Sequence, residues 1–188
     1  MTLHRLLLLA LPALVGAAPP AITWLRFAVD ERVSVRFPAP PRELPQTPLL
    51  RRLHVRVLRA TNRIGTYELL KADADLRCDT CRTDAATSHA FYDGDLAALV
   101  RSQQGRVLAR TAFATPAGEG VDVTFVGRVP GAPRRTVKYC RALLVGAAKY
   151  ALTFRPADAQ DSLGTSGRAD CRRFFASLAV ASARPAGK

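Results

Sequence analysis

The sequence lacks the short motifs that identify several common classes of enzyme. Its 188 residues contain no HExxH zinc motif, no glycine-rich phosphate loop ending in Lys and Ser or Thr, and no nucleophile elbow. Ser88, His89 and Asp93 could form a Ser–His–Asp set on paper, but without the elbow they do not indicate a hydrolase. We therefore expect no catalytic residue, no cofactor and no metal ion, and we regard an enzyme as the less favoured interpretation.

The YDGD stretch at 92–95 likewise lacks the number and spacing of oxygen ligands found in a calcium loop. Its composition is typical of a turn followed by a helix cap, with Asp93 or Asp95 as the capping residue.

Long apolar runs are also missing, apart from one near the start of the chain. Residues 6–15 follow His4 and Arg5 and precede small residues, an order typical of a secretory signal peptide. The run is too short to span a bilayer, which takes about 20 residues. We expect a signal peptide at residues 1–17 with cleavage after Ala17, and a single α+β domain at residues 18–188 that is periplasmic or secreted.

Acidic residues are scarce relative to basic ones, since 15 Asp and Glu stand against 28 Lys and Arg, for a net charge of +13. Such a surplus can indicate an anionic partner. The arginines are spread out, however, with pairs such as Arg134–Arg135 and Arg172–Arg173 but no longer run and no interleaved aromatic residues. We expect no nucleic-acid binding. A module that binds anionic cell-envelope polymers stays open beside the simpler explanation of biased amino-acid usage.

Alternating apolar and polar residues predict strands in the first part of the chain. In VSVRF at 33–37 every second residue is apolar, the period of a half-buried strand. A second alternation begins at Leu53, and a third, which includes Tyr67, follows a turn signal at 62–65. We expect residues 53–76 to form an antiparallel hairpin.

Helical spacing predicts a helix on each side of a run of strands. Leu96, Leu99 and Val100 share one helical face, and Gly105 is a natural stop. Asp170 is a possible cap for a closing helix that includes Phe174. Between the helices, short breaks favour a meander of four strands at 106–115, 120–129, 134–146 and 148–156. The fold class is therefore α+β, a mainly antiparallel sheet of about six or seven strands with two helices packed on it.

The order of several short motifs resembles that of a known family. The chain has W-x-x-F at 24–27, SVRFPAPP at 34–41, a glycine-rich strand entry at 118–128, and RALLVGAAKYALTF at 141–154 before a closing helix with FFAS. Together they resemble exported bacterial proteins with a PsbP-like α/β sandwich domain, although the cysteines depart from the usual pattern. The resemblance implies a non-catalytic extracytoplasmic accessory or assembly domain and supplies no catalytic residues.

Four cysteines, an even number, permit two disulfides in three connectivities in an exported chain. We favour Cys78–Cys81 together with Cys140–Cys171, because the second bridge would tie the closing helix to the sheet. The crossed pairings stay open, since sequence alone does not fix connectivity.

The CDTC motif at 78–81 has functional alternatives. A dithiol oxidoreductase places such a motif at a helix N-terminus within a βαβ unit, which the surrounding sequence does not predict. Arg82 stands where a c-type haem motif has histidine, and Cys140 and Cys171 are too far apart in sequence for a typical four-cysteine zinc site.

Three hypotheses about function follow. The first is a non-catalytic, disulfide-stabilised accessory or binding protein, monomeric, whose partner is an unidentified protein or envelope component. The second is an extracytoplasmic thiol–disulfide oxidoreductase that uses Cys78 and Cys81. The third is the basic module for anionic envelope polymers.

Overall fold

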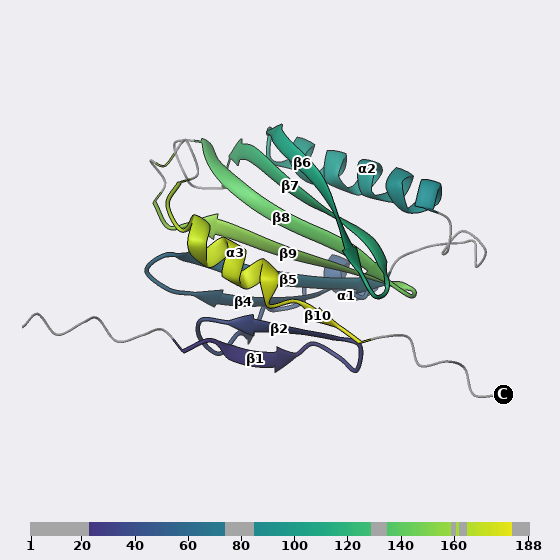
Figure 1. Cartoon of the computed structure of the whole chain (residues 1–188), viewed down its shortest axis with the longest axis horizontal. Coiled ribbons are helices and arrows are strands. Elements are labelled where there is room, and N and C mark those ends of the chain that lie inside the picture. The colour runs from purple at the N-terminus through teal and green to yellow at the C-terminus, as the bar shows by residue number, and fades with distance from the viewer. Residues whose placement is uncertain (1–22, 74–84, 129–134, 159–160, 162–164, 182–188) are drawn as a thin grey trace, which may run out of the picture.

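The main sheet of the protein contains seven antiparallel strands. A computed structural model describes residues 23–73, 85–128, 135–158, 161 and 165–181 (Figure 1). Across this sheet the strands follow in the order β3 (Arg42–Glu43), β4 (Arg56–Thr61), β5 (Gly65–Asp73), β9 (Ala148–Pro156), β8 (Arg135–Val145), β7 (Gly118–Arg128) and β6 (Arg106–Thr115). The predicted signal peptide and the CDTC motif lie outside the described residues.

Further elements cover the two faces of this sheet (Figure 1). One face packs against α2 (Ala85–Ser102). The other face packs against α3 (Arg168–Ala176) and a small sheet in the order β1 (Leu25–Ala28), β2 (Val33–Phe37) and β10 (Ala179–Val180). A short helix, α1 (Pro48–Arg52), precedes β4. The structure confirms the predicted α+β fold, and it adds the small sheet and α1.

The core between the two sheets is rich in aromatic side chains. Phe174 of α3 is fully buried, and its ring centroid lies 5.4 Å from the centroids of both Phe37 and Tyr67. Tyr67 also contacts Phe154 and Trp24, with centroid distances of 5.0 and 5.6 Å. These edge-on and tilted contacts bring β2, β5, β9 and α3 together, so α3 is held against the sheet by one continuous cluster.

A second core lies between α2 and the opposite face of the main sheet. Tyr92, Leu96 and Val100 are buried at intervals of four residues along α2. The Tyr92 hydroxyl donates a hydrogen bond to the carbonyl of Glu119 and accepts one from the amide of Leu144, both at 2.9 Å. The buried phenol therefore satisfies backbone groups of two neighbouring strands while its ring fills the core.

Several predicted boundaries agree closely with the structure. The predicted strands at 33–37, 106–115 and 148–156 coincide with β2, β6 and β9, and the expected hairpin is present as β4 and β5. Two of the meander strands begin or end one or two residues from their predicted limits.

Other boundaries differ for identifiable reasons. The first strand of the hairpin begins at Arg56 rather than at Leu53, because Leu53 is exposed and His54 has a positive φ of 49° after α1. The helix expected to begin at Asp93 or Asp95 begins at Ala85 instead, so both carboxylates lie inside α2. They serve as ion-pair partners rather than as caps, with Asp93 bound to Arg110 and Asp95 to Lys149.

The expected Cys140–Cys171 disulfide is not formed, and both thiols are free. Cys140 is buried in the α2 core, whereas Cys171 is buried in the α3 core. Successive residues of β8 point to opposite faces of the sheet, and Cys140 points towards α2. Cys171 lies on the α3 side, so the sheet separates the two sulfur atoms. The pairing of Cys78 with Cys81 stays a prediction, since neither residue is described.

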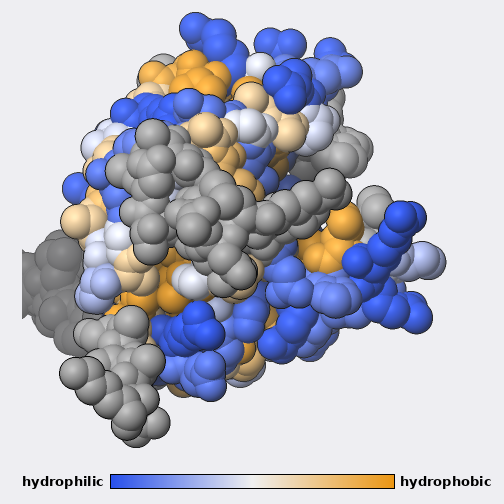
Figure 2. Space-filling view, turned by 90° about the vertical axis from the view of Figure 1, so that its right-hand side faces the viewer, coloured by the Kyte–Doolittle hydropathy of each residue, from blue (hydrophilic) through white to orange (hydrophobic). Residues whose placement is uncertain are grey.

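The face of the molecule shown in Figure 2 is mostly hydrophilic. At the end of the molecule shown in Figure 2, hydrophobic residues form separate patches between hydrophilic ones. Within the described residues, no helix is both long enough and apolar enough to cross a bilayer.

Candidate functional site

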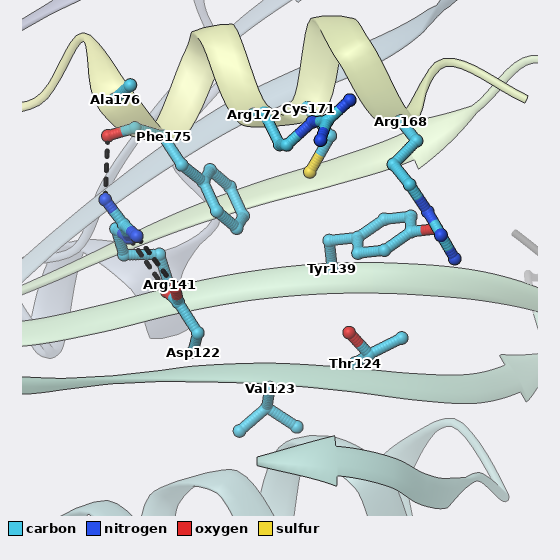
Figure 3. Close-up of a pocket in the computed structure, with 10 residues that line it drawn as sticks. All are labelled: Asp122, Val123, Thr124, Tyr139, Arg141, Arg168, Cys171, Arg172, Phe175 and Ala176. Carbon is cyan, nitrogen blue, oxygen red and sulfur yellow. Dashed lines mark hydrogen bonds and ion pairs between the residues drawn. The ribbon is translucent and has the colours of Figure 1, made fainter. Parts of the chain in front are cut away.

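A groove of about 390 Å³ lies between α3 and strands β7 and β8 (Figure 3). Residues of all three elements contribute to it: Asp122, Val123, Thr124, Tyr139, Arg141, Arg168, Cys171, Arg172, Phe175 and Ala176. Three of these residues are arginines and one is an acid, so the groove carries a positive charge. The aromatic rings of Tyr139 and Phe175 also line it.

Arg141 has a structural role at one end of the groove. Its guanidinium donates two hydrogen bonds to the carboxylate of Asp122, at 2.8 and 2.7 Å, and one to the carbonyl of Phe175 at 2.9 Å. It also lies over the rings of Phe113 and Phe175, at 4.2 and 5.2 Å from their centroids. Arg141 therefore joins the end of α3 to β7 and β8 and neutralises the one acid of the groove.

Replacing Arg141 by lysine should destabilise the protein by about 1 to 3 kcal/mol, because an ammonium group cannot reproduce the paired hydrogen bonds or the stacking. Urea unfolding monitored by circular dichroism would measure the change. Arg172→Gln is a matched control in the same groove, and we expect it to change stability by less than about 0.5 kcal/mol because its side chain is exposed. Equal losses in the two variants would contradict the structural role of Arg141.

Arg168 and Arg172 are not neutralised in this way. Asp122, the acid of the groove, pairs with Arg141 rather than with either of these guanidinium groups. Arg168 does form a hydrogen bond with Tyr139. Burial, the larger effect, raises the pKa of Tyr139, and the nearby Arg168 opposes that rise. The groove therefore presents two cations and a protonated hydroxyl.

Cys171 also lines the groove, but its thiol is not activated. Burial raises its pKa to about 12, Asp122 adds to the rise, and the nearby arginines oppose it. Burial likewise raises the pKa of Cys140 to about 12. Both thiols are therefore protonated at neutral pH and are poor nucleophiles, since the thiolate is the reactive form.

The other residues considered from sequence do not assemble into a catalytic site. His89 and Asp93 both lie on α2, but His89 faces Glu119, with 3.1 Å between Nε2 and the carboxylate, and Asp93 pairs with Arg110. Within the described part of the chain, no three His, Cys, Asp or Glu side chains are grouped as metal ligands. The hypothesis of a dithiol at Cys78 and Cys81 falls outside the described residues.

One buried charge was not anticipated from the sequence. Lys138 is 4% exposed, and its ammonium group donates hydrogen bonds to the Gln103 side chain and, at 2.8 Å, to the carbonyl of Arg128. Burial, with a smaller contribution from Arg155, lowers its pKa to about 8. These contacts anchor the segment after α2 to the end of β7. The sequence KYC does not predict this role. All three residues are buried in the structure, so no alternation of polar and apolar residues distinguishes the lysine.

Asp30 is a partly buried acid in the turn between β1 and β2 of the small sheet. One carboxylate oxygen accepts hydrogen bonds from the amides of Arg32 and Val33, each at 2.9 Å. The other lies 2.5 Å from both the Tyr150 hydroxyl and the Lys71 ammonium. Every lone pair of Asp30 is thus engaged in holding the β1–β2 turn to the main sheet, which makes this cluster structural.

Comparison with known proteins identifies the architecture. No protein-family model matches the sequence, and no curated protein matches it either. Among solved structures, the chain is similar to the solution structure of cyanobacterial PsbP (CyanoP) from Synechocystis sp. PCC 6803. The TM-score is 0.60 at 8% sequence identity, and the match covers 89% of this chain and 99% of the other. At this identity the likeness establishes the fold alone, and the fold of this chain is PsbP-like, as its short motifs predicted.

Proposed function

We propose that the protein is an exported, non-catalytic accessory or binding protein. The observation that carries this proposal is the open groove beside α3, which presents Arg168, Arg172 and aromatic side chains, while the Cys171 thiol that lines it is not activated. The PsbP-like fold supports it as an analogy, because folds do not determine function. The leader-like sequence at 1–17 supports export.

Export has a direct test. Expressed in a Gram-negative host from its complete reading frame, the protein should be recovered from the periplasm or the medium with Ala18 as its first residue. N-terminal sequencing and intact mass would measure this. Recovery only from the cytoplasm, with Met1 still present, would contradict the proposal.

The alternative function, a thiol–disulfide oxidoreductase that uses Cys78 and Cys81, can be tested by insulin reduction. The assay measures the rate at which dithiothreitol reduces insulin. We expect the mature protein to leave this rate unchanged, whereas thioredoxin, the positive control, increases it. Acceleration that disappears in Cys78→Ser would establish catalysis and refute the proposed function. Cys171→Ser serves as the matched control, since its thiol is buried and protonated.

A further inference from the structure

Most acidic side chains of the described surface are already paired, which leaves few of them for the arginines of the groove. Most described carboxylates already have a basic partner: Asp30, Glu31, Glu43, Glu68, Asp73, Asp93, Asp95, Glu119 and Asp122. Arg141, the third arginine of the groove, is satisfied by Asp122. The positive charge that remains in the groove is therefore that of Arg168 and Arg172.

The positions of these arginines on α3 are unfavourable for the isolated protein. Arg168 and Arg172 lie four residues apart, so they are neighbours on the helix surface, and like charges at this spacing destabilise a helix. Arg168 is also the first residue of α3, where the helix dipole disfavours a cation. Asp170, the acid of the first turn, accepts a hydrogen bond from Tyr67 at 3.0 Å on the core side of the helix. An anion bound in the groove would relieve both unfavourable effects.

The remaining groups of the groove suit a phosphate better than a carboxylate. A single arginine satisfies a carboxylate through two parallel hydrogen bonds. A phosphate monoester carries about −1.5 to −2 charges at neutral pH and several acceptor oxygens, which matches two guanidinium groups. The hydroxyls of Tyr139 and Thr124 also line the groove, and Phe175 offers an apolar surface for the organic part of the ligand (Figure 3).

We propose that the groove between α3 and strands β7 and β8 binds the phosphate monoester group of an organic ligand through Arg168 and Arg172. This inference rests on the proposed function, because it names the chemistry of the ligand that a binding protein would hold. The groove, at about 390 Å³, admits a phosphate and a short organic body rather than a large folded surface.

Titration followed by NMR of the amide groups of α3 would test the proposal. The probes are glycerol 3-phosphate, inorganic phosphate and acetate, each in low-salt buffer at constant pH. We expect glycerol 3-phosphate to shift α3 amides in a saturable manner, with a lower Kd than inorganic phosphate, and acetate to bind at least about tenfold more weakly. Raising NaCl from 50 to 300 mM should weaken the binding, because exposed charges are screened.

Matched variants locate the site. Arg168→Gln and Arg172→Gln should each raise the Kd for glycerol 3-phosphate at least about tenfold. Arg101→Gln removes the same charge from the last turn of α2, on the other side of the sheet, and should change the Kd less than about twofold. Equal weakening in all three variants would overturn the proposal, since it would indicate attraction by net charge alone.

Other outcomes would also overturn it. The first is the absence of saturable shifts at glycerol 3-phosphate concentrations up to about 20 mM, well above the Kd of about 1 mM that is typical of weak binding. The others are binding of inorganic phosphate alone and binding of acetate as tight as that of the phosphates. None of these results would affect the proposed function, which the insulin assay and the N-terminal sequence test separately. Insulin reduction that depends on Cys78 would refute the proposed function even if phosphate binds.

Discussion

Replacing Phe174 by alanine should lower the free energy of unfolding by about 3 to 5 kcal/mol. Phe174 is fully buried and is the ring of α3 that contacts both sheets, through Phe37 and Tyr67. Its removal would leave a cavity at the junction of three elements, and the surrounding strands are too firmly paired to close it. Urea denaturation with tryptophan fluorescence suits the measurement, because Trp24 lies 5.6 Å from Tyr67 in the same cluster.

Phe91→Ala is the matched control for this experiment. Phe91 is only partly buried against the α2 core, so the same change of side chain should cost about half as much or less. If the two variants lost equal stability, the aromatic cluster beneath α3 would not be the principal core of the protein.

Replacing Asp30 by asparagine should remove about 2 kcal/mol of stability at pH 6, and the loss should shrink in acid. Burial alone would raise the pKa of Asp30, but hydrogen bonds from Lys71, Tyr150 and the amides of Arg32 and Val33 outweigh it and lower the pKa from 3.8 to about 2. Asparagine has nearly the same shape, yet it lacks the charge that Lys71 and Tyr150 contact.

The sign of the pH dependence follows from the lowered pKa. A carboxyl group that is more acidic in the folded state contributes its full stability above its unfolded pKa of 3.8, and it loses that stability as pH falls towards 2. The advantage of the wild-type protein over Asp30→Asn should therefore fall from about 2 kcal/mol at pH 6 to less than about 1 kcal/mol at pH 2.5. Urea unfolding at a series of pH values would measure both.

Asp73→Asn is the matched control, because Asp73 pairs with His54 at a site where both side chains are mostly exposed. It should cost less than about 1 kcal/mol at pH 6. A wild-type advantage over Asp30→Asn that stayed constant from pH 6 to pH 2.5 would show that the charge of Asp30 does not stabilise the turn.

The regular strands could be predicted from the sequence because their signals are local. Apolar alternation and flanking breaks placed the strands at 33–37, 106–115 and 148–156, which the structure confirms. The short strands β1 and β10 have four and two residues, too few for alternation to be read. At Leu53 the alternation was misleading, because His54 adopts a backbone conformation that ends extended structure.

The faces of the central strands could not be predicted in the same way. In β8 the residues from Thr136 to Cys140 are all buried, since both faces of the sheet are covered, and no polar alternation remains to show which side each residue faces. An even number of cysteines therefore suggested a bridge between Cys140 and Cys171 that the sheet prevents. The groove is non-local too, because it joins α3 to Asp122 and Arg141 through tertiary packing.

The sheet keeps Cys140 and Cys171 apart as buried thiols, one in each core. Mass spectrometry of exported protein, alkylated with iodoacetamide without reductant before and after unfolding, tests this separation most directly. The native protein should take up no label at these two residues, and the unfolded protein should be labelled at both, with Cys78 and Cys81 labelled only after reduction. A peptide that links Cys140 to Cys171, or rapid labelling of either thiol in the native protein, would contradict the account.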